Sequence, residues 1–492
     1  MDLVLLNAVP FLLAALLAIP PVRQSIPKDV QTWLISGTML VLFVAALGYF
    51  PYVEEQGVVT RSLAWMEPLG LSFSYYLDGL ALLFTLVVTG VGTAIYLYAG
   101  YYFEEHEEQS RFNTILLVFT GAMLGLVLSG NLLTMFIMWE LTSITSFMLI
   151  GFKGSKYAAA RDGAFQALII TGGGGIALLA GVVGISVAAA SLNGGPVSFE
   201  LRQVLQTEGL TDHDWYTGLA ILVFIGAFTK SAQVPFHFWL PGGMSAPTPA
   251  SAFLHSATMV KAGIYLLARL YPIMGDSNLW MNTLLGFGMT TFVVGAFFAL
   301  FQRDLKGLLA YTTISKLGAI VALIGLPDAH GLKAAFVGVV AHALYKAALF
   351  LCVGSIDHST GTRHIDYLGS MARRMPGTAL VTTVSALSMA GFIPLMGFLS
   401  KETLIEAMLH YAPNTVAAVV LVFVGSVFTG TAAYILIWDV FFRPEQHEVH
   451  YHAMPRLATV APGLLMIGDG GAGLFVGPAV HSLAGNRRPQ RI

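Results

Sequence analysis

The sequence from Phe224 to Gly263 reads FIGAFTKSAQVPFHFWLPGGMSAPTPASAFLHSATMVKAG, and it places Lys230 and Lys261 inside apolar runs that are typical of helices. A cation at the centre of a bilayer costs roughly 2.5–3.5 kcal/mol, so such a residue usually faces a partner or a water-filled path. Pro235 follows Lys230 by five positions and removes a helical hydrogen bond. Further prolines and glycines interrupt any continuous helix here: Pro241, Gly242, Gly243, Pro247 and Pro249. The sequence therefore predicts a broken membrane helix beside a buried lysine.

The composition of the whole chain is that of a membrane protein. Apolar residues make up 56% of the 492 residues, charged residues make up 11%, and the mean hydropathy is +0.74. Elements that are apolar on every side suit lipid and not water. The net charge of −2 gives no electrostatic basis for binding nucleic acid. The single cysteine, Cys352, excludes an intrachain disulfide and a multi-cysteine metal or iron–sulfur site.

The apolar windows predict an all-α, polytopic fold with about fourteen transmembrane helices, because one span needs about 20 residues. No soluble catalytic domain fits in the sequence that is left. The windows cover residues 3–20, 31–50, 75–101, 112–130, 132–152, 163–190, 217–240, 250–271, 280–301, 306–325, 332–355, 377–410, 415–441 and 457–478.

The spans predict an internal repeat. A three-helix region at 1–111 precedes two sets of five spans, at 112–271 and 280–441, and a final helix and tail follow at 457–492. The fourth span of each set is interrupted, by Pro235 in the first and by Pro394 in the second. Corresponding broken helices in two halves indicate inverted repeats with a functional site near the membrane midplane.

Glu140 lies in the apolar run NLLTMFIMWELTSITSFML, where a carboxylate is costly unless it is neutral or paired with a cation. We expect Lys230 to be its partner and Glu140 to tune the proton affinity of that lysine. A purely structural ion pair is the alternative. His255 precedes Lys261 by six residues, about 120° around a continuous helix, so the two need not touch. For His255, a core histidine and a proton carrier are both open.

His342 and Lys346 lie four residues apart in VGVVAHALYKAALFL, so they share one helix face. Histidine titrates near neutral pH and a desolvated lysine can be brought towards it, so the pair suits a proton relay. Lys401 follows the second break, where a capped half-helix is the alternative reading. Lys316, in YTTISKLGAIVAL, is a further lysine in a span, and snorkelling to a membrane interface is a serious alternative for it.

Motifs for cofactor and metal chemistry are absent from the sequence. It contains no phosphate-binding loop, no GxGxxG between a strand and a helix, no HExxH and no His/Cys metal spacing. We therefore expect no cofactor, no metal site and no bond chemistry. The run TGGGG at Thr171–Gly175 lies inside an apolar span, where glycines most simply allow helices to approach closely.

The motif FTKSAQVPFHFWLPGGMSAPTPASAFLHSATMVKAG, with FQRDLKGLLAYTTISKLG, HALYKAALFL and GFLSKE, resembles the antiporter-like proton-translocating subunits of respiratory complex I and of Mrp cation/proton antiporters. Within that family the sequence looks most like the N-terminal part of the A-type subunit of Mrp antiporters. The resemblance implies that Glu140 and Lys230 form a paired switch and that Lys401 gates one exit. It also implies a hydrophilic axis formed by His255, Lys261, His342 and Lys346.

The resemblance implies one component of a multisubunit Na⁺(Li⁺)/H⁺ antiporter in the plasma (inner) membrane, a transporter and not an enzyme. Its partners would be the other Mrp subunits, B to G, including the homologous D-type subunit, together with membrane lipid and the transported ions. A proton-pumping subunit of complex I or of a membrane-bound hydrogenase is the nearest alternative, and a scaffold with an inactive axis is the third. The A-type subunits of the family usually continue beyond the fourteen-span core, whereas this sequence stops at Ile492.

Overall fold

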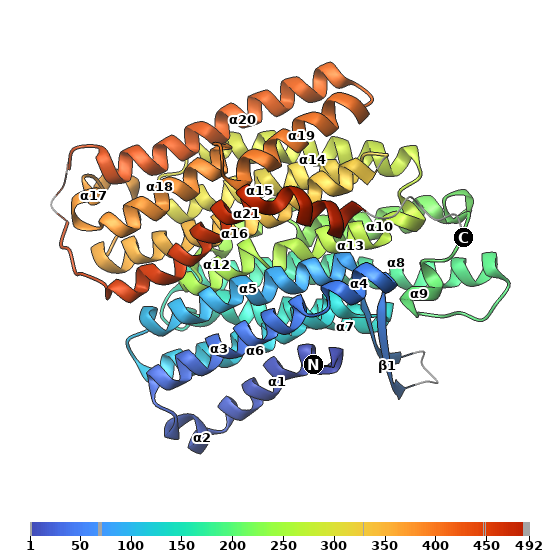
Figure 1. Cartoon of the computed structure of the whole chain (residues 1–492), viewed down its shortest axis with the longest axis horizontal. Helices are drawn as coiled ribbons and strands as arrows, with labels where there is room; N and C mark the ends of the chain where they lie inside the picture. The colour runs from blue at the N-terminus through green and yellow to red at the C-terminus, as the bar shows by residue number, and fades with distance from the viewer. Residues whose placement is uncertain (1, 67–70, 328, 446, 448, 486–492) are drawn as a thin grey trace.

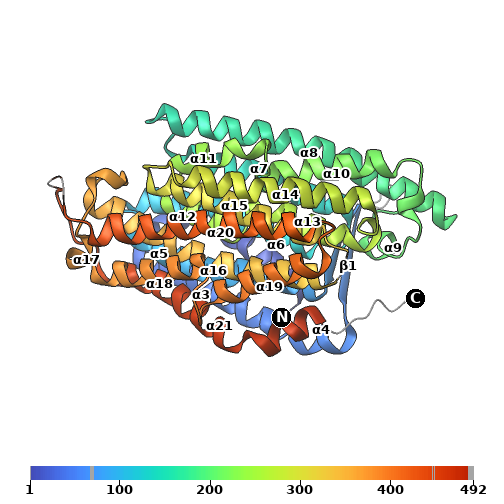
Figure 2. The ribbon, with the colours of Figure 1, turned by 90° about the horizontal axis from the view of Figure 1, so that it is seen from above.

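The computed structural model describes residues 2–66, 71–327, 329–445, 447 and 449–485. Its long helices lie side by side along the long axis of the molecule (Figure 1 and Figure 2). The uninterrupted ones are α1 (Leu3–Ala18), α3 (Lys28–Leu47), α5 (Gly79–Tyr102), α6 (His106–Leu128), α7 (Leu132–Ile150), α8 (Ala158–Asn193), α14 (Asn278–Ala299), α15 (Leu305–Ile324), α16 (Ala329–Thr360), α20 (Thr415–Ile437) and α21 (Val460–Gly485).

Three further spans are interrupted. They consist of α10 (Tyr216–Lys230) with α11 (Trp239–Gly242), α12 (Thr248–Ser256) with α13 (Met259–Met274), and α18 (Pro376–Ala390) with α19 (Met396–Tyr411). Four short helices lie in connections: α2 (Pro20–Ser25), α4 (Phe50–Gln56), α9 (Leu201–Val204) and α17 (Met371–Arg374).

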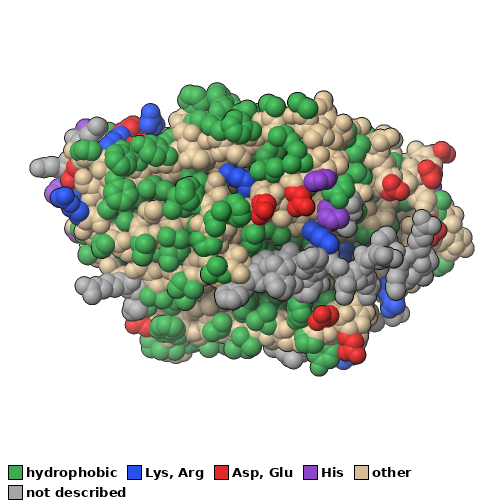
Figure 3. Space-filling view, turned by 45° about the horizontal axis from the view of Figure 1, so that its top comes forward, with side chains coloured by type: hydrophobic (Ala, Val, Ile, Leu, Met, Phe, Trp, Pro, Cys, Tyr) green, Lys and Arg blue, Asp and Glu red, His purple; other side chains and the backbone are tan. Residues whose placement is uncertain are grey.

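The helices account for the expected membrane spans. Among the described residues, nine helices are long and apolar enough to cross a membrane, and α1, α10 and the start of α21 are shorter apolar helices. The broken spans α12–α13 and α18–α19 complete the fourteen. Hydrophobic side chains spread over much of the visible surface (Figure 3), and Ile176 and Val416 are 73% and 75% exposed. Such surfaces suit lipid, and the prediction of a multi-pass membrane protein is confirmed.

Helix α16 occupies the centre of the bundle. It packs against α5, α12, α15, α18, α19 and α21, so His342 and Lys346 are surrounded by protein. In Figure 1, α1 and α20 form opposite edges of the molecule. The two broken spans α12–α13 and α18–α19 therefore both meet the helix that carries the expected relay.

The fourth spans of the two sets end their first halves in the same way. After α10, Ala232 has φ of 49° and Gln233 donates to the carbonyl of Phe228. After α18, Gly391 has φ of 88° and Phe392 donates to the carbonyl of Leu387. Both are left-handed caps that close a helix with a 6→1 hydrogen bond. The two predicted breaks are confirmed, and the shared cap supports the repeat, whose inverted symmetry and residue boundaries stay predictions.

Lys230 and Lys401 do not occupy the same position relative to their left-handed caps. Lys230 precedes its left-handed residue by two positions, and the residue in that place before Gly391 is Met389. Lys401 instead lies ten residues after Gly391, on the second half-helix. Lys230 and Lys401 thus lie on the fourth spans of the two expected sets but on opposite sides of their breaks, and the correspondence of the two spans stays a prediction.

One break was not expected. The sequence predicts one continuous span over residues 250–271, but the helix is interrupted at Ala257 and Thr258. The Thr258 hydroxyl donates to the carbonyl of Phe253 (2.8 Å) and the Ser256 hydroxyl donates to that of Ala252. Hydroxyls that bond the last carbonyls compete with continued helix. The angle of 120° between His255 and Lys261 therefore does not apply.

The all-α prediction also missed a hairpin. Strands β1 (Val59–Met66) and β2 (Leu71–Leu77) pair antiparallel, with Val59 opposite Leu77 and Arg61 opposite Tyr75. The expected span 75–101 included the end of β2, because a short run of aromatic and apolar residues does not distinguish a strand from the start of a membrane helix. The hairpin extends from one end of the helices (Figure 1). Of the predicted final helix and tail at 457–492, residues 486–492 lie outside the described residues.

Candidate functional site

A series of buried basic side chains runs through the interior of the bundle. Five of them are 0% exposed, namely Lys230, His255, Lys261, His342 and Lys346, whereas Lys401 is half-buried. Within the part of the chain that the structure describes, none of these six lies within 4 Å of a carboxylate in an ion pair. Their charges are therefore not fixed by acidic partners, which is the arrangement expected of groups that gain and lose protons.

Lys230 is the last residue of α10, so it lies at the negative end of that helix dipole. Its ammonium donates to the carbonyl of Trp139 (3.0 Å) and to the hydroxyl of Ser143 (2.6 Å), both on α7. The ammonium also lies 5.1 Å from the centre of the Trp139 ring. These contacts stabilise a cation without neutralising it.

Glu140 does not form the direct ion pair with Lys230 that the sequence suggested. The two charges are close enough to interact electrostatically, but the lysine bonds the residues on either side of Glu140 in the helix turn. The buried carboxylate oxygen Oε1 has no hydrogen-bond partner and lies against Gly175 of α8. The pair is thus separated in this structure, and its role as a switch stays a prediction.

The glycine run on α8 sets the position of Glu140. A Cβ on Gly175 would collide with Oε1 of Glu140, and a Cβ on Gly174 would collide with the hydroxyl of Thr229. A Cβ on Gly172 or Gly173 would meet no atom within 4 Å. Two of the four glycines therefore allow the close approach that the sequence predicted.

We expect Gly175→Ala to displace the Glu140 carboxylate and to lower transport. Overpacking of this kind costs about 1–3 kcal/mol, so the thermal stability should fall as well. The matched control is Gly173→Ala on the same helix, which adds the same methyl group into open space. Transport and melting temperature are measured for both variants at equal protein amounts. Equal behaviour of the two variants would contradict this role of Gly175.

The break between α12 and α13 brings Lys261 to the end of the half-helix α12. Its ammonium donates to the carbonyl of Ser256, the last residue of α12. His255 lies one residue earlier, with the ring centroids of Trp239 and Phe350 at 6.2 Å and 6.3 Å. Neither ring nitrogen of His255 has a hydrogen-bond partner among the described residues. A fully buried histidine with two free nitrogens has the capacity to accept a proton.

His342 is the point where the lysines of both halves converge. Lys261, Lys346 and Lys316 are the charged groups that act on its ring. The backbone of Ser256 lies beside the ring, but neither ring nitrogen has a partner of standard hydrogen-bond geometry in the described part of the chain. Lys346, one turn later on α16, donates to the carbonyl of Leu309 (3.1 Å) and to the hydroxyl of Thr312. The structure thus places the two predicted relay residues together on the central helix.

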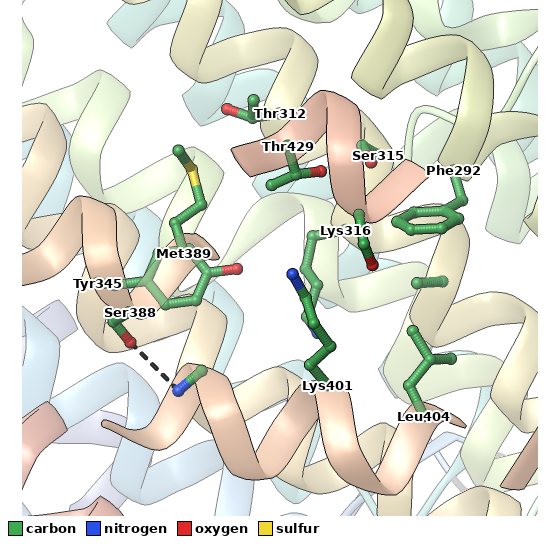
Figure 4. A pocket seen from close by; sticks show the side chains of 13 residues that line it. Phe292, Thr312, Ser315, Lys316, Tyr345, Ser388, Met389, Lys401, Leu404 and Thr429 are labelled. Atoms are coloured by element: carbon green, nitrogen blue, oxygen red, sulfur yellow. Dashed lines mark hydrogen bonds between the residues drawn. The ribbon is translucent and has the colours of Figure 1, made fainter. Parts of the chain in front are cut away.

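The second half of the series surrounds a small cavity. Its volume is about 30 Å³, and Lys316, Lys401, Ser388, Tyr345 and Thr429 are among its lining residues (Figure 4). Lys401 donates to the carbonyl of Ala390 (2.6 Å), the last residue of α18. A space of this size, with hydroxyl and ammonium groups among its lining side chains, has room for water. It can therefore hold a hydrogen-bonded connection between the side chains that line it.

Lys316 does not snorkel. Its ammonium donates to the hydroxyl of Ser400 (2.6 Å) on α19 and lines the same cavity as Lys401. The sequence could not show this because the direction of a long side chain depends on which helix packs beside it. Lys316 therefore joins the predicted series, and the interface reading of this residue is wrong.

Two lysines share one mode of attachment. Lys261 bonds the last residue of α12, and Lys401 bonds the last residue of α18. The carbonyls at a helix C-terminus have no partners in their own helix and carry partial negative charge. The breaks after α12 and α18 therefore each supply a binding position for an ammonium group, whereas Lys230 at the end of α10 bonds α7 instead.

Three buried ionisable residues among the described ones were not predicted from the sequence: Lys306, Asp469 and Arg269. Lys306, at the start of α15, is 2% exposed and donates to the carbonyl of Ala246 (2.9 Å). Asp469 on α21 is 1% exposed. By contrast, the buried Arg269 is fixed by Asp78 through a bidentate ion pair, with Nη2 to Oδ1 at 2.9 Å. Arg269 is held by an acidic partner and the lysines are not.

The chemistry available at this series is proton transfer. Buried amines, imidazoles and hydroxyls follow one another from α10 to α19, and no group of three or more His, Cys, Asp or Glu side chains within the described ranges is placed to hold a metal ion. A hard cation prefers several oxygen ligands, whereas this series consists mainly of nitrogen donors.

Comparisons with known proteins place these features in a family. The family described as "NADH:quinone oxidoreductase/Mrp antiporter, TM" matches residues 129–429, and "NADH-Ubiquinone oxidoreductase (complex I), chain 5 N-terminus" matches residues 65–113. A probable K⁺/H⁺ antiporter protein of the A/B type from Rhizobium meliloti (strain 1021) is 42% identical over 92% of this chain and 45% of its own length. The A-type subunit of a Na⁺/H⁺ antiporter from Alkalihalophilus pseudofirmus is 39% identical over 93% of this chain and 59% of its own length.

Solved structures give the same result. A chain of the Mrp complex from Dietzia sp. DQ12-45-1b has a TM-score of 0.86 and 33% identity, over 98% of this chain and 52% of its own length. A chain of respiratory complex I from Thermus thermophilus has a TM-score of 0.84 at 21% identity, over 98% of this chain and 97% of its own, and shows the shared fold alone. The chain spans about half the length of the antiporter relatives that it matches.

Proposed function

This chain belongs to the NADH:quinone oxidoreductase/Mrp antiporter family of membrane proteins, and we propose that it moves protons within a multisubunit Na⁺(Li⁺)/H⁺ antiporter. The proton-transferring residues would be Glu140, Lys230, His255, Lys261, His342, Lys346 and Lys401, with Lys316 added by its contacts. The chain is then a transporter component in the plasma membrane and not an enzyme.

One observation carries this proposal: the series of buried lysines and histidines has no ion-pair partners in the described structure. Lys230, Lys261 and Lys346 are each attached to backbone carbonyls, with hydroxyls completing two of the three sites. A carbonyl favours the protonated amine without holding the proton as firmly as a carboxylate would. Each lysine can therefore release its proton to a neighbour when the neighbouring charge changes.

The antiporter assignment is favoured over a redox-driven pump by the relatives. The antiporter proteins are 42% and 39% identical to this chain, whereas the complex I chain is 21% identical and supports only the fold. Further subunits, including one homologous to this chain, would complete the antiporter. We propose that the cation site lies outside this series, because nitrogen donors and cationic lysines are poor ligands for Na⁺.

Transport in membrane vesicles tests the proposal. Vesicles that contain the complete complex should dissipate an imposed pH gradient when Na⁺ or Li⁺ is added. K⁺ is the comparison, because one relative is named a probable K⁺/H⁺ antiporter subunit. The isolated chain should give no Na⁺-dependent exchange. Gradient changes that need a respiratory substrate and ignore Na⁺, Li⁺ and K⁺ would instead favour the redox pump, and robust exchange by the isolated chain would place the cation site on it.

A further inference from the structure

The last helix, α21, is packed directly against the second break. A Cβ on Gly473 would collide with the carbonyl of Pro394 in the segment between α18 and α19. Helix α21 also packs along α16, the central helix. Asp469 lies one turn before Gly473, so the close backbone contact brings its side chain to the place where these elements meet.

The Asp469 carboxylate is buried without a charged partner. It is 1% exposed, and neither oxygen makes a hydrogen bond within the described structure. The hydroxyl of Ser388 lies beside it, although without standard hydrogen-bond geometry, and Tyr345 is the ionisable neighbour on α16. Burying an ionised carboxylate in this position would cost free energy. The group is therefore stable there only when it is protonated or paired with a nearby cation.

The same neighbours line the cavity of the basic series. Ser388 and Tyr345 both face the space of about 30 Å³ that Lys316 and Lys401 also line. Figure 4 shows Ser388 and Tyr345 on one side of this space, with Lys401 extending into it. Asp469 is therefore separated from the lysines by a hydroxyl, a phenol and a space with room for water.

We propose that Asp469 is a proton-binding residue that exchanges protons with Lys401 and Lys316 through Ser388 and the cavity. At rest the carboxyl group is neutral; it gives its proton to a neutral Lys401 amine, which leaves carboxylate and ammonium, and the reverse step restores both. The inference rests on the proposed function, since it gives α21 a part in the same transport. It also supplies the second half with an acid, as Glu140 does for the first.

A proton suits this site better than a metal cation. One carboxylate and two hydroxyls provide fewer oxygens than Na⁺ or a divalent ion needs, and two lysines line the adjoining cavity and would repel it. The site therefore takes H⁺, and added Na⁺ should not compete for it directly.

Transport by the complete complex gives the first test. Asp469→Asn keeps the shape but removes the exchangeable proton, so transport should fall at least about a hundredfold, the lower end of what one proton-transfer group contributes. Asp469→Glu should restore part of it. The control is Glu406→Gln, an exposed acid on α19. Normal transport by the Asp469→Asn complex, or equal losses in Asp469→Asn and Glu406→Gln, would overturn the proposal.

Infrared spectroscopy tests proton binding without reference to transport. The spectrum of the wild-type complex minus that of Asp469→Asn at neutral pH should show the carbonyl band of a protonated carboxylic acid, shifted in D₂O, and the same subtraction with Glu406→Gln should not. Absence of the band overturns the proposal, as does its loss on addition of Na⁺. A band in a complex that transports no cation would refute the proposed function and leave the protonated site standing.

Discussion

Lys230→Ala is expected to abolish cation-dependent proton transport while the complex still assembles in the membrane. The side chain is 0% exposed and connects the end of α10 with Trp139 and Ser143 of α7. Its removal leaves a carbonyl and a hydroxyl that keep helical partners, and Glu140 can take up a proton, so no buried charge remains unpaired. The loss should therefore be functional, with transport at the background of empty vesicles.

A positive charge at position 230 is not sufficient for transport, because the side chain must also release its proton. Lys230→Arg keeps a cation but cannot release its proton at working pH, so it should not restore transport. Both variants are compared with wild type for transport and for the amount of assembled complex in membranes. Disappearance of the complex would show a structural role, and full transport by Lys230→Arg would show that proton release at this position is not required.

His342→Ala is expected to stop transport by interrupting the series at its centre. Lys261, Lys346 and Lys316 all act on this ring, so His342 lies between lysines of the first and second halves of the series. Alanine removes both free nitrogens and leaves a cavity in α16, for which about 2–5 kcal/mol of lost stability is typical of large core truncations. His342→Gln, which fills the space without a titratable ring, should also be inactive.

Three lysines of the series are compared with His342 in the same transport assay. Lys346→Ala, Lys401→Ala and Lys316→Ala should each lower transport, the last because Lys316 shares a cavity with Lys401. Lys333→Ala, on the same helix but half-buried away from the series, is the control. Near-normal transport by His342→Gln at matched expression would rule out a route through this ring. Normal transport by Lys316→Ala would restrict the route to the other lysines.

The class of protein, the number of spans and two of the breaks follow from the amino-acid sequence alone. Hydropathy and span length depend on the solvent and not on the packing of neighbours, so fourteen spans were readable. Proline and glycine act on their own backbone, so the breaks after Lys230 and before Lys401 were readable too. The pairing of His342 with Lys346 followed from the helix repeat alone.

The group that each buried side chain faces depends on how the helices pack against one another. Helical periodicity gives the direction of a side chain from its own axis but not the helix that lies opposite, so the contacts of Lys316 with Ser400 and of Lys230 with Ser143 were not readable. The break at Thr258 arises from hydroxyls that bond carbonyls, in a run without a proline. Asp469 lies in a glycine-rich run and was not predicted, because it is buried only through the packing of α21 against the segment between α18 and α19.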